Sequence, residues 1–159
     1  MKVHVDIQTA SQEPLPAEAD IRKWIGAALL DRTTLERVEV SVRLVDHDEM
    51  AQLNGNYRGK KGATNVLSFP AHLPIELDIP LLGDIVICAP VVGIEATQQG
   101  KSQSAHWAHM TVHGTLHLLG YDHIEEEDAK IMEALESTIL EDLNYPCPYN
   151  LARSCESLR

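Results

Sequence analysis

The sequence predicts an α+β (mixed α/β) fold, a single domain in which helices pack on a roughly four-stranded mixed sheet. Short segments in which apolar and polar residues alternate indicate half-buried strands, and longer segments with apolar residues at three- and four-residue steps indicate amphipathic helices. The length of 159 residues suits one continuous core. We expect the domain to occupy residues 1–145 and residues 146–159 to form a poorly ordered tail.

The first half of the chain predicts two strands and two helices. Valines alternate with polar residues over residues 2–8 and 36–45, as expected for strands with one buried face. Apolar residues recur at helical spacing over residues 17–30. A second helix is expected to begin after Asp46, a suitable N-cap, and to end near Gly55.

The second half predicts the rest of the sheet and three more helices. Strands are expected at residues 65–69 and 83–88, with a loop between them up to Pro80, and helices at residues 90–99, 102–120 and 125–143. The helix over 102–120 resembles the metal helix of zincins. Gly120 suits the left-handed position that ends a helix, so the chain is expected to reverse there.

Three histidines around this turn predict a metal centre. His113 and His117 are four residues apart and project from one helical face, and His123 follows the expected chain reversal. Three neutral imidazoles with a fourth position open are the ligands of a catalytic zinc. The sequence therefore predicts one zinc ion on these residues and a metal-dependent hydrolase.

Two further histidines and a glycine lie on the same helix. His106 and His117 are about 16 Å apart along a helix, so one ion does not bind all of the histidines. We interpret His106 and His109 as side chains facing a groove or solvent, with contacts to the ligands or to substrate as the alternative. Mid-helix Gly114 indicates either access for a bulky substrate or close helix packing.

Composition limits the function classes. No apolar run approaches the roughly 18 residues of a membrane span, and the N-terminus lacks a signal-peptide segment, so a cytoplasmic protein without membrane contact is expected. The net charge of −11 disfavours non-specific wrapping of nucleic acid. It leaves room for a local basic cluster at Arg58, Lys60 and Lys61.

The ligand spacing also occurs in the metzincin metalloproteases. In those enzymes a glutamate that acts as general base follows the first histidine, whereas here Gly114 follows His113. The missing glutamate argues against peptide hydrolysis by that route.

A closer resemblance is to the bacterial YbeY family. It rests on four blocks, at residues 112–123, 54–70, 82–87 and 99–102, and extends over most of residues 38–143. The first block contains the three histidines, and the second reads Asn-Gly-Asn-Tyr-Arg-Gly-Lys followed by Thr-Asn-Val-Leu-Ser-Phe-Pro. Lys61 and Ala63 depart from the family, which often has an acidic residue and a proline there.

The resemblance implies an activity, a metal site and partners. Members of the family are regarded as metal-dependent, single-strand-specific endoribonucleases that act in 16S rRNA 3′-end maturation and ribosome quality control. It implies zinc on His113, His117 and His123, a required arginine at Arg58, and a mixed sheet packed by helices. The implied partners are single-stranded RNA or rRNA and the ribosome or its small subunit with associated proteins.

In the mechanism we expect, Arg58 binds the scissile phosphate and stabilises charge on its oxygens, while the metal polarises a phosphoryl oxygen or activates water. A surface salt bridge is the alternative role for Arg58. Lys60 and Lys61 would hold flanking phosphates or form a solvated loop.

Asp122 or Asp84 could orient an imidazole or cap a turn. Water and the RNA 2′-hydroxyl are both compatible as the attacking oxygen.

Two other functions are compatible with these residues. One is a zinc hydrolase acting on another substrate, which the missing glutamate disfavours. The other is a ribosome-assembly factor in which the metal is structural, so that metal removal would unfold the protein.

Overall fold

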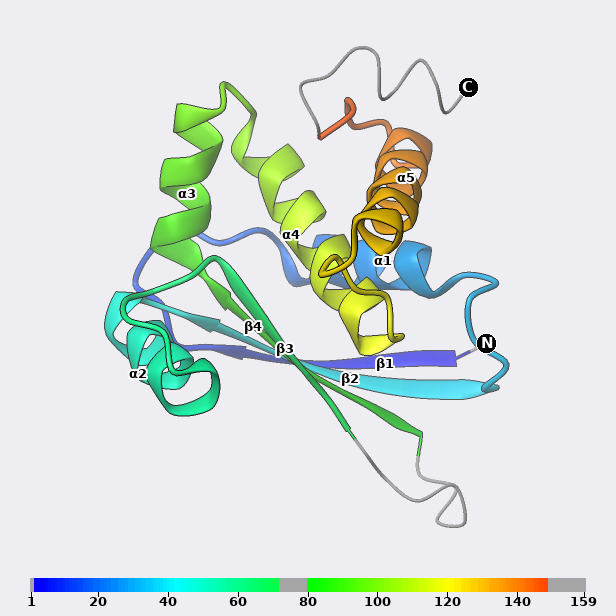
Figure 1. Cartoon of the computed structure of the whole chain (residues 1–159), viewed down its shortest axis with the longest axis horizontal. Helices are drawn as coiled ribbons and strands as arrows, with labels where there is room; N and C mark the ends of the chain where they lie inside the picture. Colours follow the sequence, from blue (N-terminus) through cyan, green and yellow to red (C-terminus); the bar gives the residue numbers. More distant parts are fainter. Residues whose placement is uncertain (1, 72–79, 149–159) are drawn as a thin grey trace.

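The computed structural model describes residues 2–71 and 80–148 (Figure 1). Along the chain it contains β1 (Lys2–Thr9), α1 (Glu18–Leu29), β2 (Arg37–Val45), α2 (His47–Arg58), β3 (Val66–Pro70), β4 (Leu81–Cys88), α3 (Ala89–Gln98), α4 (Gln103–Leu118) and α5 (Glu126–Asp142). This confirms the predicted mixed α/β domain. Most of the predicted loop up to Pro80, and residues 149–159 of the predicted tail, lie outside the described residues. None of these helices combines the length and apolar character needed to cross a membrane.

The four strands form one mixed sheet in the order β1-β2-β4-β3. The first three are parallel, and β3 pairs antiparallel with β4 as an edge strand, in a register that joins Val66 to Ile87 and Pro70 to Gly83. Pro70 therefore belongs to β3 instead of stopping the strand before it. Proline lacks a backbone N–H and is tolerated on an edge strand.

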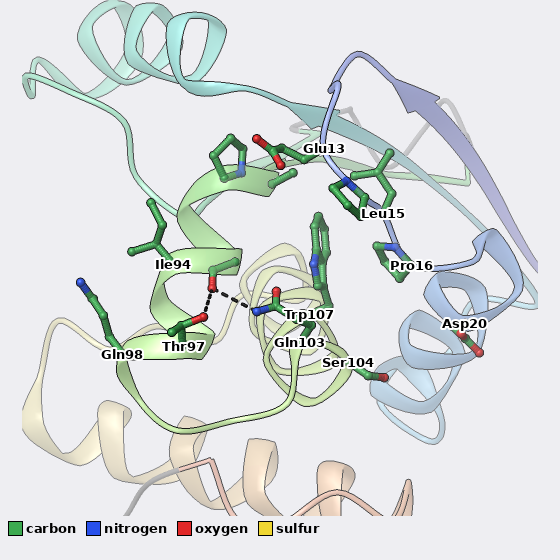
Figure 2. Close-up of a pocket in the computed structure, with 14 residues that line it drawn as sticks. Glu13, Leu15, Pro16, Asp20, Ile94, Thr97, Gln98, Gln103, Ser104 and Trp107 are labelled. Atoms are coloured by element: carbon green, nitrogen blue, oxygen red, sulfur yellow. Dashed lines mark hydrogen bonds between the residues drawn. The ribbon is translucent and has the colours of Figure 1, made fainter.

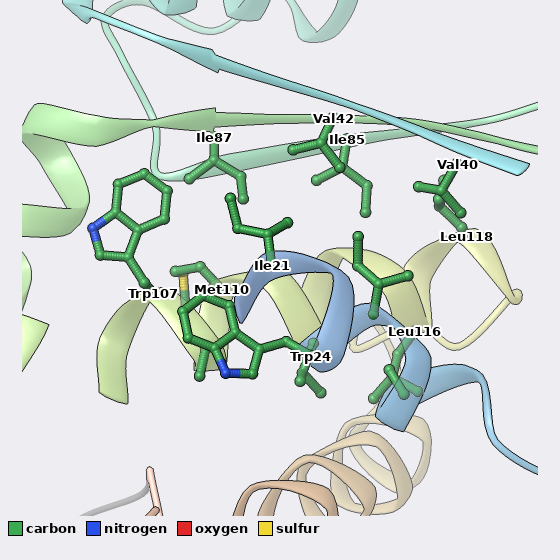
Figure 3. Packing of buried hydrophobic residues seen from close by; sticks show 14 of the residues in the cluster. Ile21, Trp24, Val40, Val42, Ile85, Ile87, Trp107, Met110, Leu116 and Leu118 are labelled. Carbon is green, nitrogen blue, oxygen red and sulfur yellow. The ribbon is translucent and has the colours of Figure 1, made fainter. Parts of the chain in front are cut away.

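The main core lies between one face of the sheet and helices α1 and α4. Trp24 of α1, Ile85 of β4 and Leu116 of α4 are at most 2% exposed and meet there, as Figure 3 shows. Helix α5 packs against α4, further from the sheet. A smaller cluster joins Met50 of α2 to Val86 on the opposite face. Successive side chains of β4 point to opposite faces of the sheet, so its apolar residues pack into a cluster on each face.

The predicted end of α2 near Gly55 is wrong. The helix continues past Gly55 to Arg58, and the left-handed residue that ends it is Gly59, with φ of 65°. Its predicted beginning is confirmed, with Asp46 at the N-cap position, but the Asp46 carboxylate does not cap the helix and instead accepts hydrogen bonds from the Ser11 hydroxyl and the Gln12 N–H. Because α2 extends to Arg58, the backbone of this residue belongs to the last turn of the helix.

Gly83 is required where β4 lies beside β3 and against α4. Its φ is +153°, and a Cβ there would lie 2.4 Å from the Phe69 carbonyl oxygen and 2.8 Å from Leu118 Cδ2. We expect Gly83→Ala to lower the free energy of unfolding by about 2–4 kcal/mol, because strain and overpacking add. Urea unfolding measures this. Gly26→Ala is the control, since nothing lies within 4 Å of a Cβ there; an equal loss in both variants would contradict the steric explanation.

Candidate metal centre

Helix α4 and the turn after it place the three histidines. The Ser102 side chain caps the helix by accepting a hydrogen bond from the Ala105 N–H, 3.1 Å away. After Leu118 the chain reverses at Gly120, whose φ is +101°, and the Tyr121 N–H donates back to the Leu116 carbonyl at 3.1 Å. The predicted helix-ending glycine is confirmed. This reversal returns His123 to the end of the helix.

The three imidazoles converge. One ring nitrogen of each of His113, His117 and His123 lies within 4.8 Å of the others, and no other such group occurs among the described residues. The Nε2 atoms of His113 and His117 are 3.1 Å apart. The His123 ring centroid lies 5.4 Å from that of His113 and 5.0 Å from that of His117.

This donor set fits a tetrahedral metal ion. Zinc binds imidazole nitrogen at about 2.0–2.1 Å, so two ligands of one tetrahedral ion are separated by about 3.4 Å. The distance between the His113 and His117 nitrogens is close to that value. Burial, together with the neighbouring His113 and His123, lowers the pKa of His117 to about 4. His117 is therefore neutral near pH 7, with a lone pair available for a metal.

Glu136 of α5 is a member of the site that sequence reasoning missed. Its side chain is 0% exposed, with Oε1 2.5 Å from His113 Nδ1 and Oε2 3.5 Å from His109 Nε2. Burial opposes ionisation, but hydrogen bonds to His109 and His113 lower the pKa of Glu136 to about 2. One signal was present in the sequence: Glu136 lies four residues after Met132, within the apolar stripe of its helix.

His106 and His109 are not exposed to solvent as expected, although His109 lines a small pocket with His113 and Glu136. They are 2% and 7% exposed, and burial lowers the pKa of both. His106 Nε2 lies 2.9 Å from Glu95 Oε1, which also accepts a hydrogen bond from Asn65 Nδ2 at 3.1 Å. Because Asn65 lines the cleft beside the triad, this network supports the cleft wall.

The two aspartates considered for orienting an imidazole have different positions. Asp122 Oδ1 accepts a hydrogen bond from the His123 N–H at 2.6 Å and lies 3.6 Å from His123 Nδ1. The hydrogen bond from that N–H lowers the pKa of Asp122. Asp84 instead lines a separate pocket with Arg43 and Glu49, so it does not support the triad.

The triad opens into a cleft of about 610 Å³ between β3, the end of α2 and the turn after α4. Arg58 and Lys60 line the cleft together with the three histidines, whereas Lys61 is exposed and is not among its lining residues. Within the described part of the chain, Arg58 makes no ion pair. The salt-bridge alternative for Arg58 therefore finds no support among these residues.

Gly114 lets α4 lie close to the sheet. A Cβ there would be 3.0 Å from Ile85 Cγ2 and 3.2 Å from both Val66 Cγ2 and Ser68 Oγ. The Ser68 hydroxyl also donates to the Gly114 carbonyl at 2.9 Å. The structure thus favours close packing as the reason for this glycine, and the packing fixes the helix that carries His113 beside β3.

A larger pocket, of about 690 Å³, lies away from the triad. Figure 2 shows it between the loop at residues 13–16, α3 and the start of α4, with Trp107, Leu15 and Ile94 lining it. Its described lining residues include no histidine and no basic side chain. Its chemistry does not match that of the metal centre.

The chain matches one family, and a solved structure has a similar fold. The model of a family described as endoribonuclease YbeY matches residues 5–144. The endoribonuclease YbeY of Pseudomonas syringae pv. tomato is 57% identical over 148 residues, which cover 92% of this chain and 88% of the relative. That of Cellvibrio japonicus is 54% identical over 157 residues, covering 99% and 88%. The solution structure of a Thermotoga maritima protein has a TM-score of 0.62 at 26% identity and covers 87% of this chain and 88% of its own.

Proposed function

Because the chain belongs to the YbeY family and is an endoribonuclease, we propose that it is a zinc-dependent enzyme specific for single-stranded RNA. His113, His117 and His123 would hold one zinc ion. The observation that carries this proposal is that the three histidines and Arg58 line the same cleft. A metal ion and a fixed positive charge in one cleft can together stabilise the negative charge that develops on the phosphate during phosphodiester cleavage.

The protein's own residues have distinct tasks in this mechanism. Bound zinc supplies Lewis acidity toward a phosphate oxygen or water. Arg58 binds the scissile phosphate and stabilises the charge that grows on its oxygens, since a guanidinium presents paired donors to a phosphate. Lys60, on the cleft wall, and Lys61 beside it hold flanking phosphates.

The position of the metal centre in a cleft supports a preference for single-stranded RNA. The scissile phosphate must enter the cleft to reach both the triad and Arg58. An unpaired strand can splay its bases and bend its backbone into such a site, whereas the backbone of an A-form duplex is held in a regular helix.

We test this with one labelled RNA, presented alone and annealed to its complement, and with metal-loaded protein. The expected result is internal cleavage of the single strand at least about ten times faster than cleavage of the duplex, which corresponds to about 1.4 kcal/mol. Chelation should stop cleavage, and added zinc should restore it. Equal rates on both forms would refute the single-strand preference.

A structural role for the metal is the competing function. The His123 side chain is 53% exposed, so the triad is open to solvent on one side and unlike a closed four-ligand structural site. We therefore expect circular dichroism to show that the fold survives chelation. Unfolding on chelation would favour the structural role.

The biological role that we propose is processing of rRNA, at the 3′ end of 16S rRNA, and ribosome quality control in the cytoplasm. The net charge of −11 disfavours strong binding to naked RNA. The ribosomal small subunit or its proteins would therefore supply the specificity. Site-correct cleavage of protein-free precursor RNA by this protein alone would contradict the need for that partner.

A further inference from the structure

Glu136 stands out among the charged residues because it is buried in the middle of a helix. It lies on the buried face of α5 with Met132 and Ile139, and its side chain is 0% exposed. A buried carboxylate is costly unless it is paired or hydrogen-bonded. Its hydrogen-bond partners therefore indicate why this position holds a glutamate.

The carboxylate bridges two imidazoles of α4. Its Oε1 lies 2.5 Å from Nδ1 of His113, and its Oε2 lies 3.5 Å from Nε2 of His109. A carboxylate accepts hydrogen bonds and does not donate them, so Nδ1 of His113 carries the proton. The other nitrogen of that ring, Nε2, then has a free lone pair.

This lone pair points toward the other two histidines of the triad. Nε2 of His113 is 3.1 Å from Nε2 of His117, on the side of the ring away from Glu136. The His113 ring is thus held by one nitrogen and presents the other to its two partner histidines. A carboxylate behind a ligand histidine fixes its tautomer and orientation and makes it a better ligand.

We propose that Glu136 is a positioning residue for the metal centre: it holds His113 as the Nδ1–H tautomer with Nε2 aimed at the ion. His109 steadies the second oxygen of the same carboxylate. This inference rests on the proposed metal binding by the three histidines. It adds a residue from α5 to a site otherwise formed by α4 and the turn that follows it.

The first test is the zinc dissociation constant of the full chain, measured by competition with a chelator. Glu136→Gln should weaken zinc binding by roughly 10–100-fold, the usual effect of losing such a partner. Glu133→Gln is the matched control, because it makes the same charge change one turn earlier. Glu133 lines a small pocket together with Glu136 and His113, but among the described residues it forms no ion pair with a histidine. The control should bind zinc as the wild type does. Equal affinities in all three proteins would overturn the proposal.

The second test does not depend on whether a variant folds. In the metal-free wild type, ¹⁵N chemical shifts of His113 report which ring nitrogen carries the proton. The proposal expects Nδ1–H, and an Nε2–H tautomer would overturn it. Neither test uses RNA, so a protein that binds zinc but does not cleave RNA would refute the proposed activity while leaving the role of Glu136 standing.

Discussion

Replacing His117 by alanine is expected to abolish zinc binding and RNA cleavage while the protein stays folded. His117 supplies one of three converging nitrogens, and its ring lies at the end of α4, partly exposed to the cleft. Losing a direct ligand should cost more than the roughly 10–100-fold effect of losing a supporting residue. Isothermal titration with zinc and a single-stranded RNA cleavage assay measure the two losses.

The control for this prediction is His4→Ala. His4 is an exposed residue of β1 and lies outside the cleft. It should leave zinc affinity, cleavage and the circular dichroism spectrum unchanged. If His117→Ala were folded and cleaved RNA as fast as the wild type, the triad would not be the catalytic centre.

Replacing Arg58 by alanine is expected to slow cleavage by roughly 10²–10³-fold, as removal of a single charge-stabilising donor does elsewhere. Zinc affinity should be unchanged, because Arg58 is not one of the converging ligands. Arg58→Lys should recover only part of the rate, since an ammonium keeps the charge but loses the paired geometry. Single-turnover kinetics separate this effect from weaker RNA binding.

Lys23→Ala is the matched control for Arg58. It also removes one positive charge, but from an exposed position of α1 outside the cleft. A loss in the control as large as that in Arg58→Ala would mean that general electrostatic attraction, and not contact with the scissile phosphate, explains the effect of Arg58.

The convergence of the histidines could be predicted because it depends on local sequence. A four-residue spacing puts His113 and His117 on one helical face, and Gly120 permits the reversal that returns His123. The strands could be predicted for the same kind of reason, because alternation along β1 and β2 indicates one buried face and the apolar run at the end of β4 indicates a strand buried on both faces.

Features that depend on contacts between distant elements could not be read from spacing. Glu136 reaches His113 across the packing of α5 on α4, and nothing near either residue in the sequence specifies that distance. Asp46 matched a capping pattern, but its carboxylate accepts a hydrogen bond from Ser11, which is 35 residues away in the sequence. Arg58 was singled out by its Tyr-Arg-Gly context and by family resemblance, and its place in the cleft required the three-dimensional structure.

The most direct test of the proposed metal centre is the rate of RNA cleavage as zinc is returned to metal-free wild type. If the three histidines form the ribonuclease centre, cleavage should be absent at first, rise in proportion to bound zinc, and level off at one ion per chain. Cleavage by the metal-free protein at the full rate would contradict the proposed zinc-dependent mechanism, because metal on the triad would then have no part in the reaction.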